Sequence, residues 1–169
     1  MLADVRAENH KIKGQTYTSK KLPRNIHIIS GWGAGESVKW NTDGTQLAVM
    51  LEAWDNKDRW LVNVNLLENK LISQHRLHDE AWINWEFNEF GWLNNSDQLY
   101  YLSEESGYSH LYLKSLKGKA KQLTSGKYEV SDVTLTDDDT KFVFKANKKH
   151  PGIYEIYQVD VASSAMTAL

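Results

Sequence analysis

The sequence has 169 residues and contains no cysteine. This absence excludes disulfides and thiolate metal sites, although an oxidising compartment tolerates a chain without cysteine equally well. No apolar run approaches the ~20 residues that a membrane-spanning helix needs. The first residues, 2–6, lack the apolar segment of a secretory signal, so no signal peptide is predicted to begin at Met1.

An excess of charge of one sign is also missing. The formal net charge is −2, and the 20 basic residues are scattered along the chain. Nucleic-acid-binding proteins concentrate basic side chains on one surface, so no nucleic-acid partner is expected. The composition, with 41% hydrophobic and 25% charged residues, is typical of a soluble globular chain with a core.

What the sequence does contain is one short pattern that recurs three times. Each copy has a large apolar residue, a turn built on Asx residues, and then an apolar run. The first residues of the copies, Trp40, Trp92 and Leu135, are 52 and 43 residues apart. Such a period is typical of propeller blades or solenoid units. The turn pairs suit tight hairpins, and they are Asp43-Gly44, Asn95-Ser96 and Asp138-Asp139.

Further strands are expected after each hairpin. In residues 60–66, one strand face carries Trp60, Val62, Val64 and Leu66, and the other carries Asn63 and Asn65, which is the period of a strand. Similar segments follow at 110–116 and 154–159, and weaker third strands are expected at 71–74, 121–125 and 165–169.

We therefore predict an all-β fold, a β-propeller fragment of about three four-stranded antiparallel blades. The expected blades are 37–81, 82–130 and 131–169. Residues 1–36 are expected to be a lead-in that ends a preceding blade and includes a glycine-rich connector at 30–36. Because propellers close with four to eight blades, the chain is expected to be a piece of a larger propeller with open edges.

Three segments carry a more specific likeness. Residues 78–92, 102–112 and 121–130 resemble, in order and spacing, the propeller of dipeptidyl-peptidase-IV-like serine peptidases of the prolyl oligopeptidase clan. The resemblance covers roughly residues 30–161. It implies a propeller cap over an α/β-hydrolase domain that carries Ser, Asp and His. It also implies short peptide substrates, with penultimate Pro or Ala, and favours a periplasmic or secreted location.

The chain itself is not expected to be catalytic. An α/β-hydrolase needs a Gly-x-Ser-x-Gly turn to expose its nucleophile, and the nearest stretch, 107–111, lacks the second glycine. Members of the family also bind the substrate's amino terminus with two glutamates. Glu104 and Glu105 match that pair by type only, since they fall within a predicted hairpin, so the role is not assigned to them.

The segment between the first two expected blades is the candidate substrate-binding site. Its rings could form apolar walls and its polar groups could orient a peptide, whereas the alternative is that the rings only pack between blades. In the resembled family this loop contributes an Arg and an aromatic, but no Arg occurs here. The candidate residues are Trp82, Asn84, Trp85, Glu86, Phe87, Asn88 and Glu89.

Two polar clusters contain residue types that can bind metal ions. His75 and His78, followed by Asp79 and Glu80, could hold Zn²⁺ on a helix, but they follow a predicted strand and lack the His-Glu-x-x-His pattern. The carboxylates are expected to cap backbone groups or to pair with Arg76. The contiguous acids 137–139 lack the alternating ligands of a calcium loop and favour an exposed turn. No metal and no cofactor is therefore predicted.

Three functional hypotheses follow from the sequence. The leading one is a non-catalytic cap fragment of a dipeptidyl-peptidase-like serine exopeptidase, whose partner is a short peptide bound through the parent's hydrolase domain. The alternative is a stand-alone propeller-like module that binds a protein or glycan. A third possibility is self-association through the open blade edges.

Overall fold

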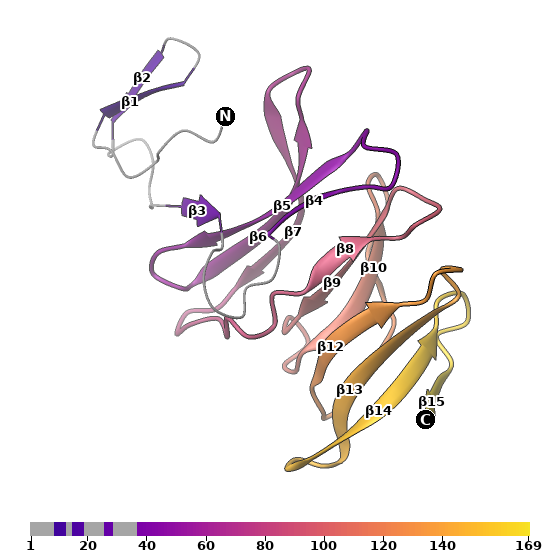
Figure 1. Cartoon of the computed structure of the whole chain (residues 1–169). Coiled ribbons are helices and arrows are strands. Elements are labelled where there is room, and N and C mark those ends of the chain that lie inside the picture. The colour runs from indigo at the N-terminus through magenta and orange to yellow at the C-terminus, as the bar shows by residue number, and fades with distance from the viewer. Residues whose placement is uncertain (1–8, 13–14, 19–25, 29–36) are drawn as a thin grey trace.

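The computed structural model describes residues 9–12, 15–18, 26–28 and 37–169, which contain strands and no helix (Figure 1). Strands β1 (Asn9–Ile12) and β2 (Gln15–Thr18) form a separate two-stranded hairpin. All other described strands belong to three antiparallel sheets. This architecture confirms the predicted all-β propeller fragment.

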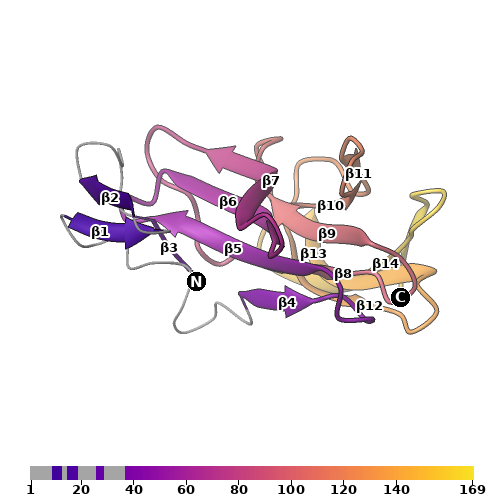
Figure 2. The same ribbon diagram turned by 90° about the horizontal axis from the view of Figure 1, so that it is seen from above.

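The three sheets follow one another along the chain and lie side by side (Figures 1 and 2). The first sheet contains β3 (Ile26–Ile28), β4 (Val38–Trp40), β5 (Leu47–Ala53), β6 (Asp58–Asn65) and β7 (Lys70–His78). The second contains β8 (Phe90–Trp92), β9 (Gln98–Ser103), β10 (His110–Ser115) and β11 (Lys121–Gln122). The third contains β12 (Val130–Leu135), β13 (Lys141–His150), β14 (Ile153–Asp160) and β15 (Met166–Ala168).

Two short strands share the edge of the first sheet. Strand β3 pairs with the second half of β5, from Leu51 to Ala53, while β4 pairs with its first half, from Leu47 to Val49. Residues 26–28 therefore extend the edge of the first sheet. The glycine-rich connector expected at 30–36 lies outside the described residues. The limits of the individual blades stay a prediction.

The hydrophobic core lies between neighbouring sheets. Successive residues of β5 point to opposite faces, so Ala48 and Met50 pack toward the second sheet, against Phe90 and Tyr101, while Val49 and Leu51 belong to a separate cluster. A third cluster joins the second and third sheets through side chains such as Phe142. A sheet that is apolar on both faces needs a layer on each side, which is how blades stack around a propeller.

Hydrogen bonds connect the turn of the first hairpin in each sheet to the corresponding turn of the neighbouring sheet. Asn41 Nδ2, after β4, donates to Asp97 Oδ1, before β9, at 2.7 Å. The backbone N–H groups of Asn94 and Asn95 donate to the two carboxylate oxygens of Asp139 at 2.8 and 2.7 Å. The recurring turns thus connect adjacent sheets as well as adjacent strands.

Candidate functional site

The segment between β7 and β8, residues 79–89, contains all seven predicted site residues, and we call it the connector. It begins with a tight turn, in which Asp79 Oδ1 accepts the backbone N–H groups of Ala81 and Trp82 at 2.7 and 3.1 Å. The predicted capping role of Asp79 is therefore confirmed. Ile83 is 3% exposed, and its N–H donates to the carbonyl of Asn56 at 2.7 Å. This contact fastens the connector to the β5–β6 turn.

The predicted site residues separate into an exposed group and a buried group. Trp82 and Trp85 are 57% and 52% exposed, and Glu86 beside them is exposed. Phe87 and Asn88 are buried. The structure therefore presents two indole rings and one carboxylate at the surface, while the later residues of the connector face inward.

Asn84 and Asn88 give the connector its shape. The Oδ1 atom of Asn84 accepts the N–H of Glu86 at 3.0 Å. The Nδ2 group of Asn88 donates to the carbonyl of Trp85. Phe87 packs into the core cluster between the second and third sheets. The surroundings of Phe87 thus match the alternative hypothesis for this segment, in which an aromatic ring packs between two sheets.

Glu89 contacts the third sheet. Its two carboxylate oxygens accept the N–H groups of Asp132 and Val133 in β12, at 2.7 and 2.6 Å. The pairing of β12 with β13 shifts register at this point, and Asp132 has a φ of 52°. The carboxylate thus satisfies two donors that the β-bulge leaves outside the ladder. Burial raises the pKa of Glu89, and the two N–H groups oppose that rise.

Sequence reasoning missed Arg59, which lies under the connector. Arg59 belongs to β6 and is 3% exposed. Its Nη1 group donates to the carbonyl of Asn84 at 3.0 Å and to Oδ1 of Asn88. One sequence signal was available, because Arg59 shares a strand face with Leu61 and Asn63. This alternation does not indicate which loop the guanidinium contacts.

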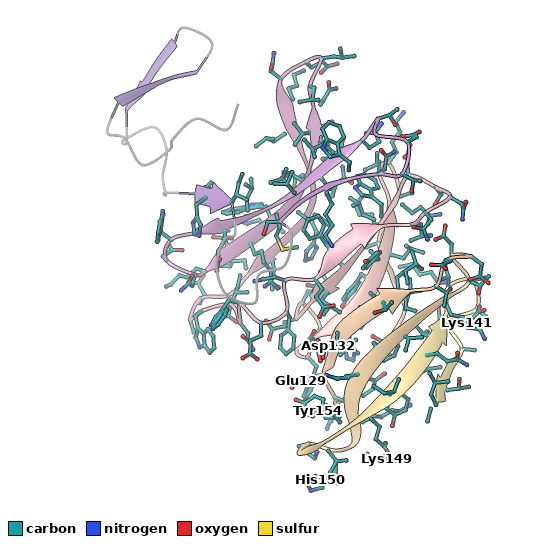
Figure 3. All side chains as sticks on the ribbon, in the orientation of Figure 1. Glu129, Asp132, Lys141, Lys149, His150 and Tyr154 are labelled. Carbon is teal, nitrogen blue, oxygen red and sulfur yellow. The ribbon has the colours of Figure 1, made fainter. Side chains whose placement is uncertain are left out.

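Side chains of the following two sheets surround the connector. Glu104 follows β9, and burial raises its pKa, whereas Arg59 opposes the rise. Tyr154 Oη donates to Glu129 Oε2 at 3.2 Å, and Figure 3 shows both near one end of the third sheet. Burial raises the pKa of Tyr154, and the charges of Glu129 and Glu86 add to the rise. The exposed part of the connector thus lies in acidic surroundings.

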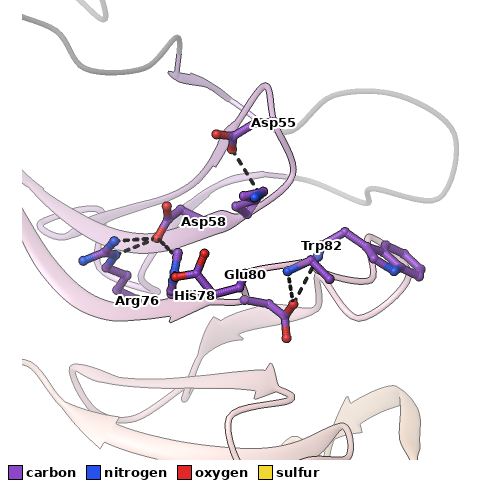
Figure 4. Close-up of polar contacts among 9 residues, drawn as sticks. Asp55, Asp58, Arg76, His78, Glu80 and Trp82 are labelled. Carbon is purple, nitrogen blue, oxygen red and sulfur yellow. Dashed lines mark hydrogen bonds and ion pairs between the residues drawn. The ribbon is translucent and has the colours of Figure 1, made fainter.

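The two histidines considered for a metal lie inside β7, not after it. Arg76 Nη2 and His78 Nδ1 both approach Oδ1 of the buried Asp58, at 2.7 and 3.0 Å, and His78 Nε2 lies 3.1 Å from Glu80 (Figure 4). Arg76 thus pairs with Asp58 rather than with the carboxylates expected from the sequence. No group of three or more potential metal ligands occurs within the part of the chain that the structure describes.

The family model of the dipeptidyl peptidase IV (DPP IV) N-terminal region matches residues 8–169. The chain belongs to this family. It is a partial dipeptidyl-peptidase-IV-like propeller domain, as the resemblance of its motifs indicated.

Curated relatives and solved structures agree with this assignment. Dipeptidyl peptidase 4 of Arthroderma otae and that of Trichophyton rubrum are each 30% identical over 112 residues, which are 64% of this chain and 14% of the relative. The crystal structure of Porphyromonas gingivalis dipeptidyl peptidase 4 superimposes with a TM-score of 0.71 at 17% identity, over 90% of this chain and 22% of that one. A putative dipeptidyl aminopeptidase IV from Bacteroides ovatus gives a TM-score of 0.65 at 17% identity, over 83% and 22% of the two chains.

The matched part of the chain spans only 14% of the length of these curated relatives. At 17% identity, the structural likeness shows the fold alone. Among the described residues there is no helix with the length and apolar character to cross a membrane.

Proposed function

We propose that this chain is the non-catalytic, substrate-access part of a dipeptidyl-peptidase-like serine exopeptidase. It would restrict entry and orient short peptides over a hydrolase site located elsewhere in the parent protein. The observation that carries the proposal is the connector, which exposes Trp82 and Trp85 next to Glu86 on a backbone fastened from below. Membership of the family supports the peptide as the ligand class.

The chemistry of the connector suits a short peptide. Indole rings offer large flat apolar surfaces, against which a proline ring or an alanine methyl group can pack. The carboxylate of Glu86 and the neighbouring carboxylates of Glu104 and Glu129 attract a protonated amino group. Apolar walls with a few placed polar groups are typical of small-ligand sites.

The proposal is tested by calorimetric titration of the chain with the tetrapeptide Ala-Pro-Ala-Ala. The double substitution W82A/W85A is expected to weaken binding by about tenfold or more, because two ring contacts are lost. The matched control is W40A, because the exposed fraction of Trp40 in β4, 51%, is nearly equal to that of Trp85, 52%. Equal weakening by W40A, or no effect of W82A/W85A, would contradict the proposal.

Two further expectations complete the proposal. The peptide should remain intact during the titration, because the sequence has no Gly-x-Ser-x-Gly nucleophile turn; turnover by the purified chain would contradict the cap assignment. Self-association through open blade edges stays a prediction, and light scattering of a concentrated sample tests it.

A further inference from the structure

Arg59 is a cation buried where the first sheet meets the connector. The side chain starts from β6, and its pKa is lowered to about 10, mainly because burial disfavours the charged form. Glu104 and Glu52 lie close enough to oppose that decrease. A buried charge costs free energy unless it is paired and hydrogen-bonded, so the contacts that Arg59 makes indicate why it is there.

Those contacts go to the backbone of the connector. Arg59 Nη1 donates to the carbonyl of Asn84 at 3.0 Å and to Oδ1 of Asn88. Asn88 is 5% exposed, and the Nδ2 group of the same side-chain amide donates to the carbonyl of Trp85. The amide of Asn88 therefore connects Arg59 to Trp85. One guanidinium thus determines, directly or through a single amide, the position of two consecutive carbonyls.

The position of these carbonyls sets the direction of the exposed rings. Trp85 carries one of the two carbonyls, and Trp82 lies two residues before the other. Ile83, between them, is fixed by its bond to Asn56. With the backbone held on both sides of Trp85, the direction in which its side chain leaves the connector is fixed, and the ring lies 52% exposed instead of buried in the core.

The arrangement is also not the one that stability alone would favour. Within the described part of the chain, Arg59 Nη2 is buried and has no hydrogen-bond partner. A buried donor without an acceptor costs about 1–3 kcal/mol. A buried ion cluster is also often replaced by apolar side chains without loss of stability. The contacts of Arg59 with the connector therefore explain its presence better than stability does.

We infer that Arg59 is a positioning residue for peptide recognition, which acts through Asn84 and Asn88 to hold the two indole rings of the connector in their exposed orientation. The inference rests on the proposed function for its peptide, but the effect on the connector is independent of any ligand. Lysine would not serve in its place, because the donors of an ammonium group rotate freely, whereas the two N–H groups of Nη1 lie in the rigid plane of the guanidinium and fix the direction of both bonds.

The test compares the unmodified chain with the variants R59M and R59K by amide hydrogen exchange and by titration with Ala-Pro-Ala-Ala. Because R59M leaves Glu52 and Glu104 without their nearby cation, the milder variant N88A provides a second measurement. It keeps the guanidinium and its bond to the carbonyl of Asn84, and it removes the amide that accepts from Arg59 and donates to the carbonyl of Trp85. The matched control is K70M, which also removes one positive charge, from an exposed side chain of β7.

In R59M and R59K, the N–H groups of Ile83 and Glu86 are expected to exchange at least tenfold faster, while that of Val130, bonded to the carbonyl of Ser109, stays unchanged. N88A should accelerate exchange at Glu86. Peptide affinity should fall at least fivefold in the same variants, and the indole NMR signals of Trp82 and Trp85 should shift. K70M should change none of these quantities.

Three outcomes separate the inference from the proposed function. Unchanged exchange in the connector would overturn the inference. A loosened connector that binds the peptide as tightly as the unmodified chain would overturn the link to recognition. If the unmodified chain binds no peptide, the proposed function fails, and the exchange rates and indole signals alone decide whether Arg59 positions the connector.

Discussion

Replacing His75 by glutamine is expected to remove a large part of the chain's sensitivity to mild acid. His75 lies in β7 at the contact between the first two sheets, with its side chain 13% exposed. Its Nε2 atom is 3.0 Å from Ser103 Oγ, and its ring stacks on Tyr101 with centroids 4.6 Å apart. Burial lowers the pKa of His75 to about 4, and the positive charges of Arg59 and Lys114 add to the decrease.

The sign of the effect follows from proton binding. Between the ordinary pKa of 6.5 and the folded pKa of about 4, the unfolded chain binds a proton at His75 that the folded chain does not bind. Stability therefore falls as the pH falls through this window and is unaffected at neutral pH. The two pKa values correspond to a loss of about 2 kcal/mol at pH 5 and about 3 kcal/mol at pH 4 and below. The carboxylate of Glu105, at 3.7 Å from Nδ1 but 41% exposed, reduces this loss.

Urea unfolding at pH 7, 6 and 5 measures the effect. Glutamine still reaches Ser103 but does not titrate, so the free energy of unfolding of H75Q relative to the unmodified chain should rise by about 2 kcal/mol from pH 7 to pH 5. Buried carboxylates with raised pKa, such as Glu104, act in the opposite direction in both proteins and cancel in the difference. H150Q, at the exposed end of β13, controls for the substitution itself. Parallel pH curves for H75Q and the unmodified chain would refute the reasoning.

Two further substitutions test the contacts around β8. E89A leaves the two N–H groups of the β12 bulge without their acceptor and should lower the free energy of unfolding by about 1–3 kcal/mol, whereas E86A, at an exposed position, should change it by less than ~0.5 kcal/mol; equal effects would contradict the role of Glu89. G91A places a Cβ 2.6 Å from the ring of Tyr100. It should cost about 1–3 kcal/mol in urea unfolding, and Y100L should relieve most of this cost if the ring is the obstacle.

The strands were predictable because their signals are local. The alternation of Val62 and Val64 with Asn63 and Asn65, and the Asx turns, are contained in a few consecutive residues, and hydrogen bonds between successive strands follow from short hairpins. Strand β3 was not predicted for the converse reason. It is three residues long, and its partner β5 begins almost twenty residues later, so no local pattern indicates the pairing.

The sequence predicted which segment forms the candidate site, but not which of its side chains are exposed and which are buried. The connector has no strand or helix period, so its sequence does not separate the exposed Trp85 from the buried Phe87. That separation depends on Arg59, which is 25 residues before Asn84 in the sequence. A buried cation is selected by the acceptors that surround it in space, and nothing in the spacing of residues 59–88 specifies which acceptors these are.

The acidic triplet 137–139 shows why residue type alone is a weak guide to chemistry. Asp138 accepts the hydroxyl groups of Thr136 and Thr140 at 2.7 and 2.8 Å, and these bonds, with the N–H of Thr140, lower its pKa to about 2. Asp139 accepts the backbone of the neighbouring hairpin with both carboxylate oxygens. Acceptor positions filled by N–H and O–H donors hold strands and sheets in register. Acidic residues that could suggest a calcium site therefore join one sheet of the propeller to the next.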